Sequence, residues 1–197
     1  MMRAFALSSL LALTPALLSA QWSVGLGFGI ARYYGGAAPV GDSVEGSVHP
    51  YRPTTLDLTV GRDWGAIRVD LGLEYGEPGL AAEVPDGAFI ETTAAHYAAV
   101  APELSFRLGG VGAGGALRVG AGPEFVLWNV SGFDPRILPG GHAAVAYEWP
   151  VAGSFVGSIR AGLSLSPSVF RDADLPSDFE RRMMVRPSIT IGLRLRP

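Results

Sequence analysis

Large apolar residues alternate with small or polar residues along most of the chain. In the segment 22–31 every second residue is large and apolar, and the residues between them are serine, glycine or alanine. A period of two places the apolar side chains on one face of a β-strand. The same alternation recurs at 55–60, 67–75, 100–108, 117–127, 143–149, 155–165 and 188–195. The pattern therefore predicts an all-β chain with eight strands.

The connections between these strands alternate between long and short. Long segments lie at 35–51, 76–91, 131–140 and 167–184, and short turns lie at 63–65, 109–115 and 150–153. This order is typical of an eight-stranded antiparallel up-and-down transmembrane β-barrel with short periplasmic turns and long outer loops. In the fourth and fifth strands, Pro102 and Pro123 lack a backbone N–H and are expected almost opposite each other, so the pairing should be broken there.

Aromatic residues gather at both ends of the predicted strands, as expected at the two water interfaces of a membrane barrel. Those at the short-turn ends are Trp22, Trp64, Phe106, Trp149 and Phe155. Those at or near the long-loop ends are Tyr33, Tyr34, Tyr51 and Tyr75. The arrangement favours a membrane barrel over a soluble barrel, in which the apolar face would lie inside.

The second face of each strand indicates which side points inward. It is rich in glycine, alanine and serine, and only 17% of all residues are charged, fewer than a water-facing surface normally carries. We therefore expect this face to line the lumen and the apolar face to contact lipid. The predicted lipid-facing residues are Trp22, Leu26, Phe28, Val69, Leu71, Leu163, Ile191 and Leu193.

The charges on the inward face are predicted to form a structural network. An eight-stranded barrel is just wide enough to be filled by side chains, and a charge in that space must be paired. The network is predicted to consist of Asp57, Arg68, Asp70, Glu74, Glu103, Arg107, Arg118, Glu124, Glu148, Arg160 and Arg194. We expect Arg194 to fill the space beside the glycines of the first strand. A lumen filled in this way should conduct no sizeable ion current.

Residues 1–20 are predicted to be a cleaved signal peptide, so that the barrel domain covers residues 21–197. Arg3 supplies a positive charge, an apolar run follows as far as Leu18, and the small residue Ala20 precedes the expected cut. The run is short for a membrane-spanning helix. The chain has no second long apolar run, which excludes a helical membrane protein, and it has no cysteine for a lipoprotein signal or a disulfide.

The alternating segments WSVGLGFGI, AIRVDLGLEY and SITIGLRLR resemble the strands of small eight-stranded outer-membrane barrels of the OmpA and OmpX type, within the outer-membrane β-barrel domain superfamily. The resemblance covers residues 22–196 as architecture. It implies an outer-membrane location, a monomer, insertion by the barrel-assembly machinery, and contact with outer-membrane lipid and lipopolysaccharide. The chain departs from such proteins at its end, which reads Leu195-Arg196-Pro197 where they usually carry a final aromatic residue.

The three histidines do not form a pattern typical of catalysis or metal binding. His49 is expected in a loop, and His96 and His142 are expected near the outer rim, without the spacing of metal ligands on one strand. Some eight-stranded barrels deacylate lipid A. A barrel that resembles this type is expected to carry a histidine and a serine as a pair on one strand. Here Tyr97 follows His96 and Ala143 follows His142, so this pair is absent. We predict no catalytic, cofactor-binding or metal-ligating residues.

The last predicted loop carries a further group of charges. Its acids, Asp172, Asp174, Asp178 and Glu180, lack the glycine-hinged spacing of a known calcium motif. The segment 177–180 matches a capping box, so a short helix is expected to start there. Arg181 and Arg182 follow and could contact lipopolysaccharide phosphates, although a solvated charged loop is the simpler interpretation.

Three functions remain open at this stage. The formal net charge of −3 gives no basic surface for nucleic acid. The first function is a non-enzymatic outer-membrane barrel with a side-chain-filled lumen and no cofactor, acting in envelope integrity, adhesion or surface recognition through its long outer loops. The alternatives are an outer-membrane lipid-modifying enzyme and a secreted soluble barrel that binds a small apolar ligand.

Overall fold

The structure, a computed structural model, describes residues 21–40, 46–84, 87–112 and 114–196. The predicted signal peptide, residues 1–20, lies outside the described residues. Within the described part of the chain, no helix has both the length and the apolar character needed to span a membrane.

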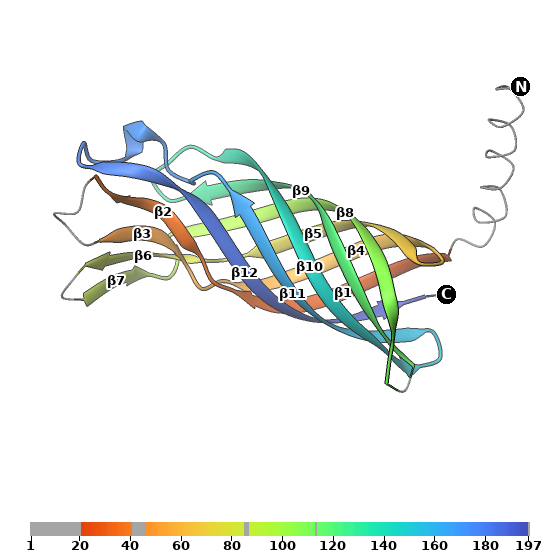
Figure 1. Cartoon of the computed structure of the whole chain (residues 1–197). Helices are drawn as coiled ribbons and strands as arrows, with labels where there is room; N and C mark the ends of the chain where they lie inside the picture. The colour runs from red at the N-terminus through yellow and green to blue at the C-terminus, as the bar shows by residue number, and fades with distance from the viewer. Residues whose placement is uncertain (1–20, 41–45, 85–86, 113, 197) are drawn as a thin grey trace, which may run out of the picture.

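Eight strands close into a ring (Figure 1). They are β1 (Gln21–Ala31), β4 (Thr54–Trp64), β5 (Ile67–Gly76), β8 (Ala95–Val111), β9 (Gly115–Val130), β10 (Arg136–Ala152), β11 (Phe155–Ser166) and β12 (Phe179–Leu195). Each strand is antiparallel to its neighbours in the ring, and the pairing of β1 with β12 closes it. The predicted eight-stranded antiparallel up-and-down barrel is confirmed, and every predicted strand falls inside an observed one.

The outer surface of the ring is apolar, as predicted. The eight side chains predicted to face lipid are all exposed, from 45% for Val69 to 62% for Ile191. Charged side chains point the other way, and those of Arg68 and Glu124 are 1% and 3% exposed. A secreted soluble barrel does not fit this arrangement, because it would bury its apolar face and expose its charges.

Four further strands project beyond the outer rim of the barrel (Figure 1). They are β2 (Tyr34–Pro39), β3 (Ser47–Tyr51), β6 (Gly79–Val84) and β7 (Gly87–Glu91), and we call them the outer extension. β2 pairs with the outer half of β12, β3 pairs with β2 and β6, and β6 pairs with β7. The sequence predicted loops here, which is wrong. These strands are short, and segments such as YGGAAP lack the alternating large apolar residues that reveal a strand.

Two strands of the ring start well inside segments predicted to be long loops. β10 begins at Arg136 and β12 at Phe179, inside segments that were predicted to be loops. The helix expected to start at Ser177 is not formed, because the chain instead enters β12 and pairs with β2. The helical turn in the described part of this loop is a short 3₁₀ helix further upstream, at Asp172–Asp174.

The pairing of β8 with β9 is interrupted at the two prolines. The pairs on both sides of the gap keep one register, in which Pro102 faces Pro123, but no ladder pair forms between 101–103 and 122–124. The predicted break is therefore confirmed. A separate register shift lies closer to the short turn, between Arg107 and Gly109.

The predicted aromatic belts are observed with one exception at the outer rim. Trp22 at the inner end is 57% exposed, and Tyr34 and Tyr75 at the outer end are 47% and 45% exposed. Tyr33 was expected in the outer belt, but it is 3% exposed and points into the lumen. Tyr33 has the same inward parity as Ala31, which is also buried. The alternation of inward and outward side chains in β1 therefore continues two residues beyond its end.

Candidate functional site

Five charged side chains form one cluster at the inner end of the lumen. Arg68 donates to both carboxylate oxygens of Glu148, at 2.5 and 3.2 Å, and its Nε donates to Asp63 Oδ1 at 2.8 Å. Arg118 Nη2 donates to the same Asp63 oxygen at 3.3 Å, and Arg196 Nη2 donates to Glu148 Oε2 at 2.7 Å. Because Arg68 is buried, these carboxylates replace the water that its charge has lost.

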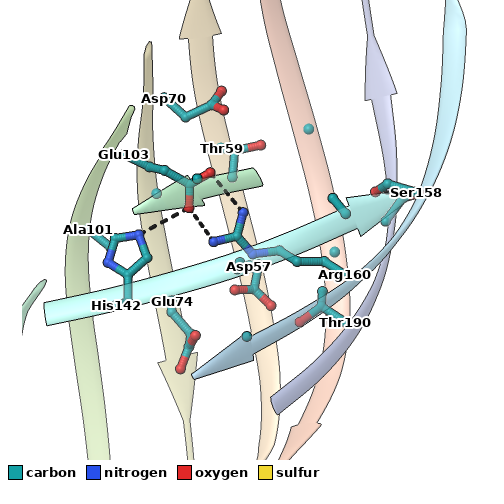
Figure 2. A pocket seen from close by; sticks show the side chains of 18 of the residues that line it. Asp57, Thr59, Asp70, Glu74, Ala101, Glu103, His142, Ser158, Arg160 and Thr190 are labelled. Atoms are coloured by element: carbon teal, nitrogen blue, oxygen red, sulfur yellow. Dashed lines mark hydrogen bonds and ion pairs between the residues drawn. The ribbon is translucent and has the colours of Figure 1, made fainter. Parts of the chain in front are cut away.

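Glu103 on β8 joins two other strands in the middle of the lumen (Figure 2). The two terminal nitrogens of Arg160, on β11, donate to the Glu103 carboxylate, and Nη1 lies 3.0 Å from Oε1. His142 Nε2, on β10, lies 3.1 Å from Glu103 Oε2. The sequence placed His142 near the outer rim. Because β10 starts early, His142 instead lies well inside the strand and faces the lumen, with a side chain 7% exposed.

Arg194 lies beside Gly25 on β1, whereas threonine side chains occupy the space that the sequence assigned to arginine next to Gly27 and Gly29. Arg194 Nη1 donates to Asp70 Oδ1 at 2.7 Å and to Ser23 Oγ at 2.9 Å. A Cβ atom on Gly25 would lie 2.5 Å from Thr59 Oγ1 and 3.6 Å from Arg194 Nε, so these two side chains together fill the space next to this glycine. The Arg194–Asp70 ion pair links β12 to β5 across the point where β1 and β12 close the ring.

Arg186 on β12 is the charged centre of the outer half of the lumen, and the sequence analysis did not identify it. Its guanidinium donates to Glu74, to Glu124 and to the Tyr97 hydroxyl, the last at 2.6 Å. The Tyr97 hydroxyl itself donates to Glu74. Arg186 lay next to the predicted loop and was therefore left out. It shares the parity of Arg194 on the same strand, and this signal could have identified it.

Apolar side chains close the lumen on the outer side of Arg186. Its guanidinium lies 5.2 Å from the ring centre of Tyr97 and 5.9 Å from that of Tyr33. The rings of Tyr33, Tyr97 and Trp128 pack together with centres 5.0 to 6.4 Å apart. Around them lie Ala37, Ala95, Ala99, Val126, Val130, Leu138, Val169, Phe170 and Met184, and we call the whole set the outer plug.

A cavity of about 130 Å³ remains between the ion-pair clusters, with lining residues from all eight strands of the ring. Asp57 points toward it (Figure 2) and accepts a hydrogen bond from Thr55 Oγ1 at 3.3 Å. His142 Nδ1 also lies in this region, buried and without a hydrogen-bond partner in the described structure. Charged and hydroxyl side chains in the lining of the cavity give water molecules hydrogen-bond partners there.

Nine members of the predicted network are ion-paired inside the barrel. They are Arg68, Asp70, Glu74, Glu103, Arg118, Glu124, Glu148, Arg160 and Arg194. The other two differ. Asp57 lines the cavity without an ion pair to any described residue. Arg107 is exposed and has no ion pair within the described chain, because it lies at the register shift close to the short turn and faces Arg118 across the strand pair.

The described residues contain no group of three or more histidine, aspartate or glutamate side chains that could hold a metal ion. Each lumen carboxylate that forms an ion pair faces arginine instead. The arrangement can therefore link strands and fill space.

Solved structures resemble the chain, although no family model matches it and no curated protein matches its sequence. The fold is similar to that of Neisserial surface protein A, with a TM-score of 0.59 and 9% identity over 91% of this chain and 99% of that one. It is also similar to the outer membrane protein OprG from Pseudomonas aeruginosa, with a TM-score of 0.57 and 11% identity over 90% of this chain and 96% of that one. These likenesses show the fold of a small outer-membrane β-barrel.

The fold and the surface agree on where the protein lies. Barrels of this fold span the outer membrane with an apolar band facing lipid, and the ring here carries such a band from β1 round to β12. The protein is an outer-membrane β-barrel.

Proposed function

We propose that the protein is a non-enzymatic outer-membrane barrel that acts in adhesion or surface recognition through its outer extension. The lumen is occupied by ion pairs and by the outer plug, so the barrel serves as a rigid mount in the membrane. The extension projects beyond the ring at its outer end, next to the start of β12 (Figure 1). The paired strands of the outer extension and its edge strand, β7, support the proposal.

The outer extension is an ordered sheet with several attachments. β6 pairs with the whole of β3, from Ser47–Glu83 to Tyr51–Gly79. His49 Nε2 on β3 lies 3.4 Å from a Glu83 carboxylate oxygen on β6, so this histidine lies in a strand rather than in the predicted loop. A backbone of paired strands presents its side chains in fixed positions, which lowers the entropy lost on binding.

β7 forms the free edge of this sheet. It is the last strand in the pairing order, and all five of its residues are exposed. Phe89 is 76% exposed and Ile90 is 46% exposed, although both lie beyond the lipid-facing band. An unpaired edge with apolar side chains is a template on which another protein chain can dock. A protein that displays such an edge outside the cell has a surface suited to recognition.

The position of the lumen histidine supports a non-enzymatic role. An enzyme acting on a membrane lipid needs its reacting groups where the lipid can reach them. His142 and its partner Glu103 are 7% and 6% exposed and face the lumen, behind the strands that contact lipid. This pair is held by Arg160 in a structural ion-pair cluster.

A cell-adhesion assay tests the role of β7. Cells producing the wild-type protein or the F89N/I90N variant are compared with cells carrying empty vector, on plates coated with extracellular-matrix proteins or host-cell layers. We expect the wild type to increase adhesion and F89N/I90N to lower it towards the vector level. V151N makes the same kind of change at an exposed position beside a short turn, at the opposite end of the barrel, and should adhere like the wild type.

Two outcomes would contradict the proposal. Equal adhesion of F89N/I90N and the wild type, at equal surface amounts, would show that β7 is not the recognition surface. Adhesion of wild-type cells no greater than that of vector cells, together with increased detergent sensitivity of a deletion strain, would favour a role in envelope integrity instead.

A further inference from the structure

Two arginines, Arg32 and Arg52, flank the point where the outer extension leaves the barrel. Arg32 directly follows β1, and Arg52 directly precedes the extended residues that lead into β4. β1 and β4 pair up to the rim, and the backbone N–H of Ala31 donates to the carbonyl oxygen of Pro53 at 3.0 Å, which continues the same register. Continued by one more residue, this register brings Arg32 opposite Arg52.

Both arginine side chains point away from the lumen. Both are exposed, and the outward-facing residues further down the same strands are Ile30, 61% exposed, and Leu56, 52% exposed. Those apolar residues belong to the band that faces lipid. The two guanidinium groups therefore lie at the outer border of this band, at the level where lipid headgroups begin.

Each of these guanidinium groups lies over a tyrosine ring. The Cζ atom of Arg32 is 5.0 Å from the ring centre of Tyr34, and that of Arg52 is 5.6 Å from the ring centre of Tyr51. Such stacking holds the planar group in place and leaves the N–H bonds at its edges free to donate. The tyrosines thus orient two sets of donors on one small area of the rim.

Among the described residues, no carboxylate forms an ion pair with Arg32 or Arg52. The arginines that the sequence suggested for phosphate contact differ, because Arg181 Nε lies 2.6 Å from Asp172 Oδ1 and Arg182 pairs with Glu180. Like charges at facing positions of adjacent strands repel each other. An anion bound between Arg32 and Arg52 removes this repulsion.

We propose that Arg32 and Arg52 together bind the phosphate group of an anionic lipid in the outer leaflet. Two planar guanidinium groups can each donate two hydrogen bonds to phosphate oxygens, and the acyl chains of the lipid then lie along the apolar band below. The site requires the barrel to be in a membrane, but it does not depend on recognition by β7. The two proposals can therefore fail separately.

Native mass spectrometry of the folded full barrel, released from neutral detergent micelles, tests the site. The protein is titrated separately with lipid A, phosphatidylglycerol, phosphatidylcholine and inorganic phosphate. We expect the wild type to bind lipid A or phosphatidylglycerol roughly tenfold or more tightly than zwitterionic phosphatidylcholine, a difference of about 1.4 kcal/mol. The R32Q/R52Q variant should lose this preference. The R181Q/R182Q variant removes the same charge from the outer side and should keep it.

Three results would overturn the proposal. The first is a wild-type preference that R32Q/R52Q retains. The second is an equal loss in R32Q/R52Q and R181Q/R182Q, because it would show general attraction to a positive surface. The third is displacement of the anionic lipids by inorganic phosphate at similar concentrations, which would indicate a site for a free anion. The gel mobility of unboiled samples shows whether each variant is folded before its binding is compared.

Discussion

Single arginines in the lumen hold carboxylates that come from strands far apart in the sequence. Arg186 on β12 reaches Glu74 on β5 and Glu124 on β9. Replacing it with methionine keeps much of its volume but leaves the buried Glu124 and the half-buried Glu74 without a cation. We expect Arg186→Met to lower the free energy of unfolding by about 3–5 kcal/mol. Urea unfolding of the barrel in phospholipid vesicles, followed by the mobility of unboiled samples on gels, measures the change.

Arg107 provides the matched control for this prediction. It was predicted to belong to the same network, but it is exposed and unpaired among the described residues. Arg107→Met should therefore change the free energy of unfolding by no more than about 0.5 kcal/mol. If the two variants lost equal stability, the ion pairs of Arg186 would not be what stabilises the outer half of the lumen.

The lipid-facing surface makes a prediction that depends on depth. Leu71 lies in the middle of β5 and is 47% exposed on the outer face. Replacing it with arginine should cost about 2–4 kcal/mol of unfolding free energy in bilayers, because the charge would lie near the midplane. Leu108 faces outward beside a short turn, where the same substitution should cost about 0–1 kcal/mol. Equal costs at both positions would show that the strands cross the membrane at a different depth.

Residue alternation predicted most of the lumen network, and strand ends explain what it missed. Charges in the middle of strands, such as Asp70 and Glu103, have an unambiguous parity. Asp63 looked like part of a turn and Arg186 like the border of a loop, although both point inward. Their partners lie on other strands, and a single sequence does not show how far a strand continues past its last large apolar residue.

The paired prolines predict an element-scale effect at their neighbour Gly122. A Cβ atom on Gly122 would overlap the carbonyl oxygen of Pro102, because the two backbones come close where the ladder is broken. We expect Gly122→Ala to destabilise the barrel by about 1–3 kcal/mol, since backbone must move to make room. The same urea titration in vesicles gives the value.

Gly141 on β10 is the control for this change. It pairs with Pro123, and a Cβ atom there would lie 3.7 Å from the nearest heavy atom, the carbonyl oxygen of Gly122, which is an ordinary contact. Gly141→Ala should be neutral or should stabilise the barrel by up to about 1 kcal/mol, because alanine restricts the unfolded chain. Destabilisation of similar size at both glycines would point to a general intolerance of added side chains in this part of the barrel, with no special role for the break.

At the scale of elements, the ring could be predicted from the sequence but the outer extension could not. Each strand of the ring has one face in lipid, which demands a large apolar residue at every second position, as in β1 and β5. The strands of the extension lie beyond the lipid-facing band, so they need no large apolar residue at every second position. β2 is held mainly by backbone pairing with β12, and sequences such as YGGAAP satisfy that pairing without a visible pattern. The capping box at 177–180 failed for a related reason, since tertiary pairing outweighed a weak local preference for helix.

For the whole molecule, the interior is divided into zones along the barrel axis. Arginine–carboxylate clusters occupy the inner end, the middle and the outer half, and the outer plug lies beyond them. The apolar part of this interior was not expected, yet Val126 and Trp128 share one parity on β9 and could have indicated it. Closure therefore rests on two kinds of interaction in series, salt-bridged polar clusters and packed aromatic rings.

This series of closures leads to a prediction about ion conduction. An ion crossing the barrel would have to displace the outer plug, then separate Arg186 from its carboxylates, and finally pass Arg68 and Glu148. Each opposite-charge contact is worth about 4 kcal/mol at an effective dielectric constant near 20 and a separation of ~4 Å. We expect the purified folded monomer to give no stable, large conductance steps in a planar lipid bilayer.

Variants that remove one closure at a time make this prediction sharper. Trp128→Ala opens a hole in the outer plug, but the ion-pair clusters behind it remain, so the variant should stay closed. A variant that combines Trp128→Ala with loss of Arg186 and Arg68 removes one group from each barrier and should conduct, provided that it still folds by gel mobility. Steady large steps from the wild type would mean that the lumen is open, and the protein would then have to be treated as a channel. Conduction by Trp128→Ala alone would instead locate the whole barrier in the plug, because the charged clusters would then offer a hydrated path between their side chains.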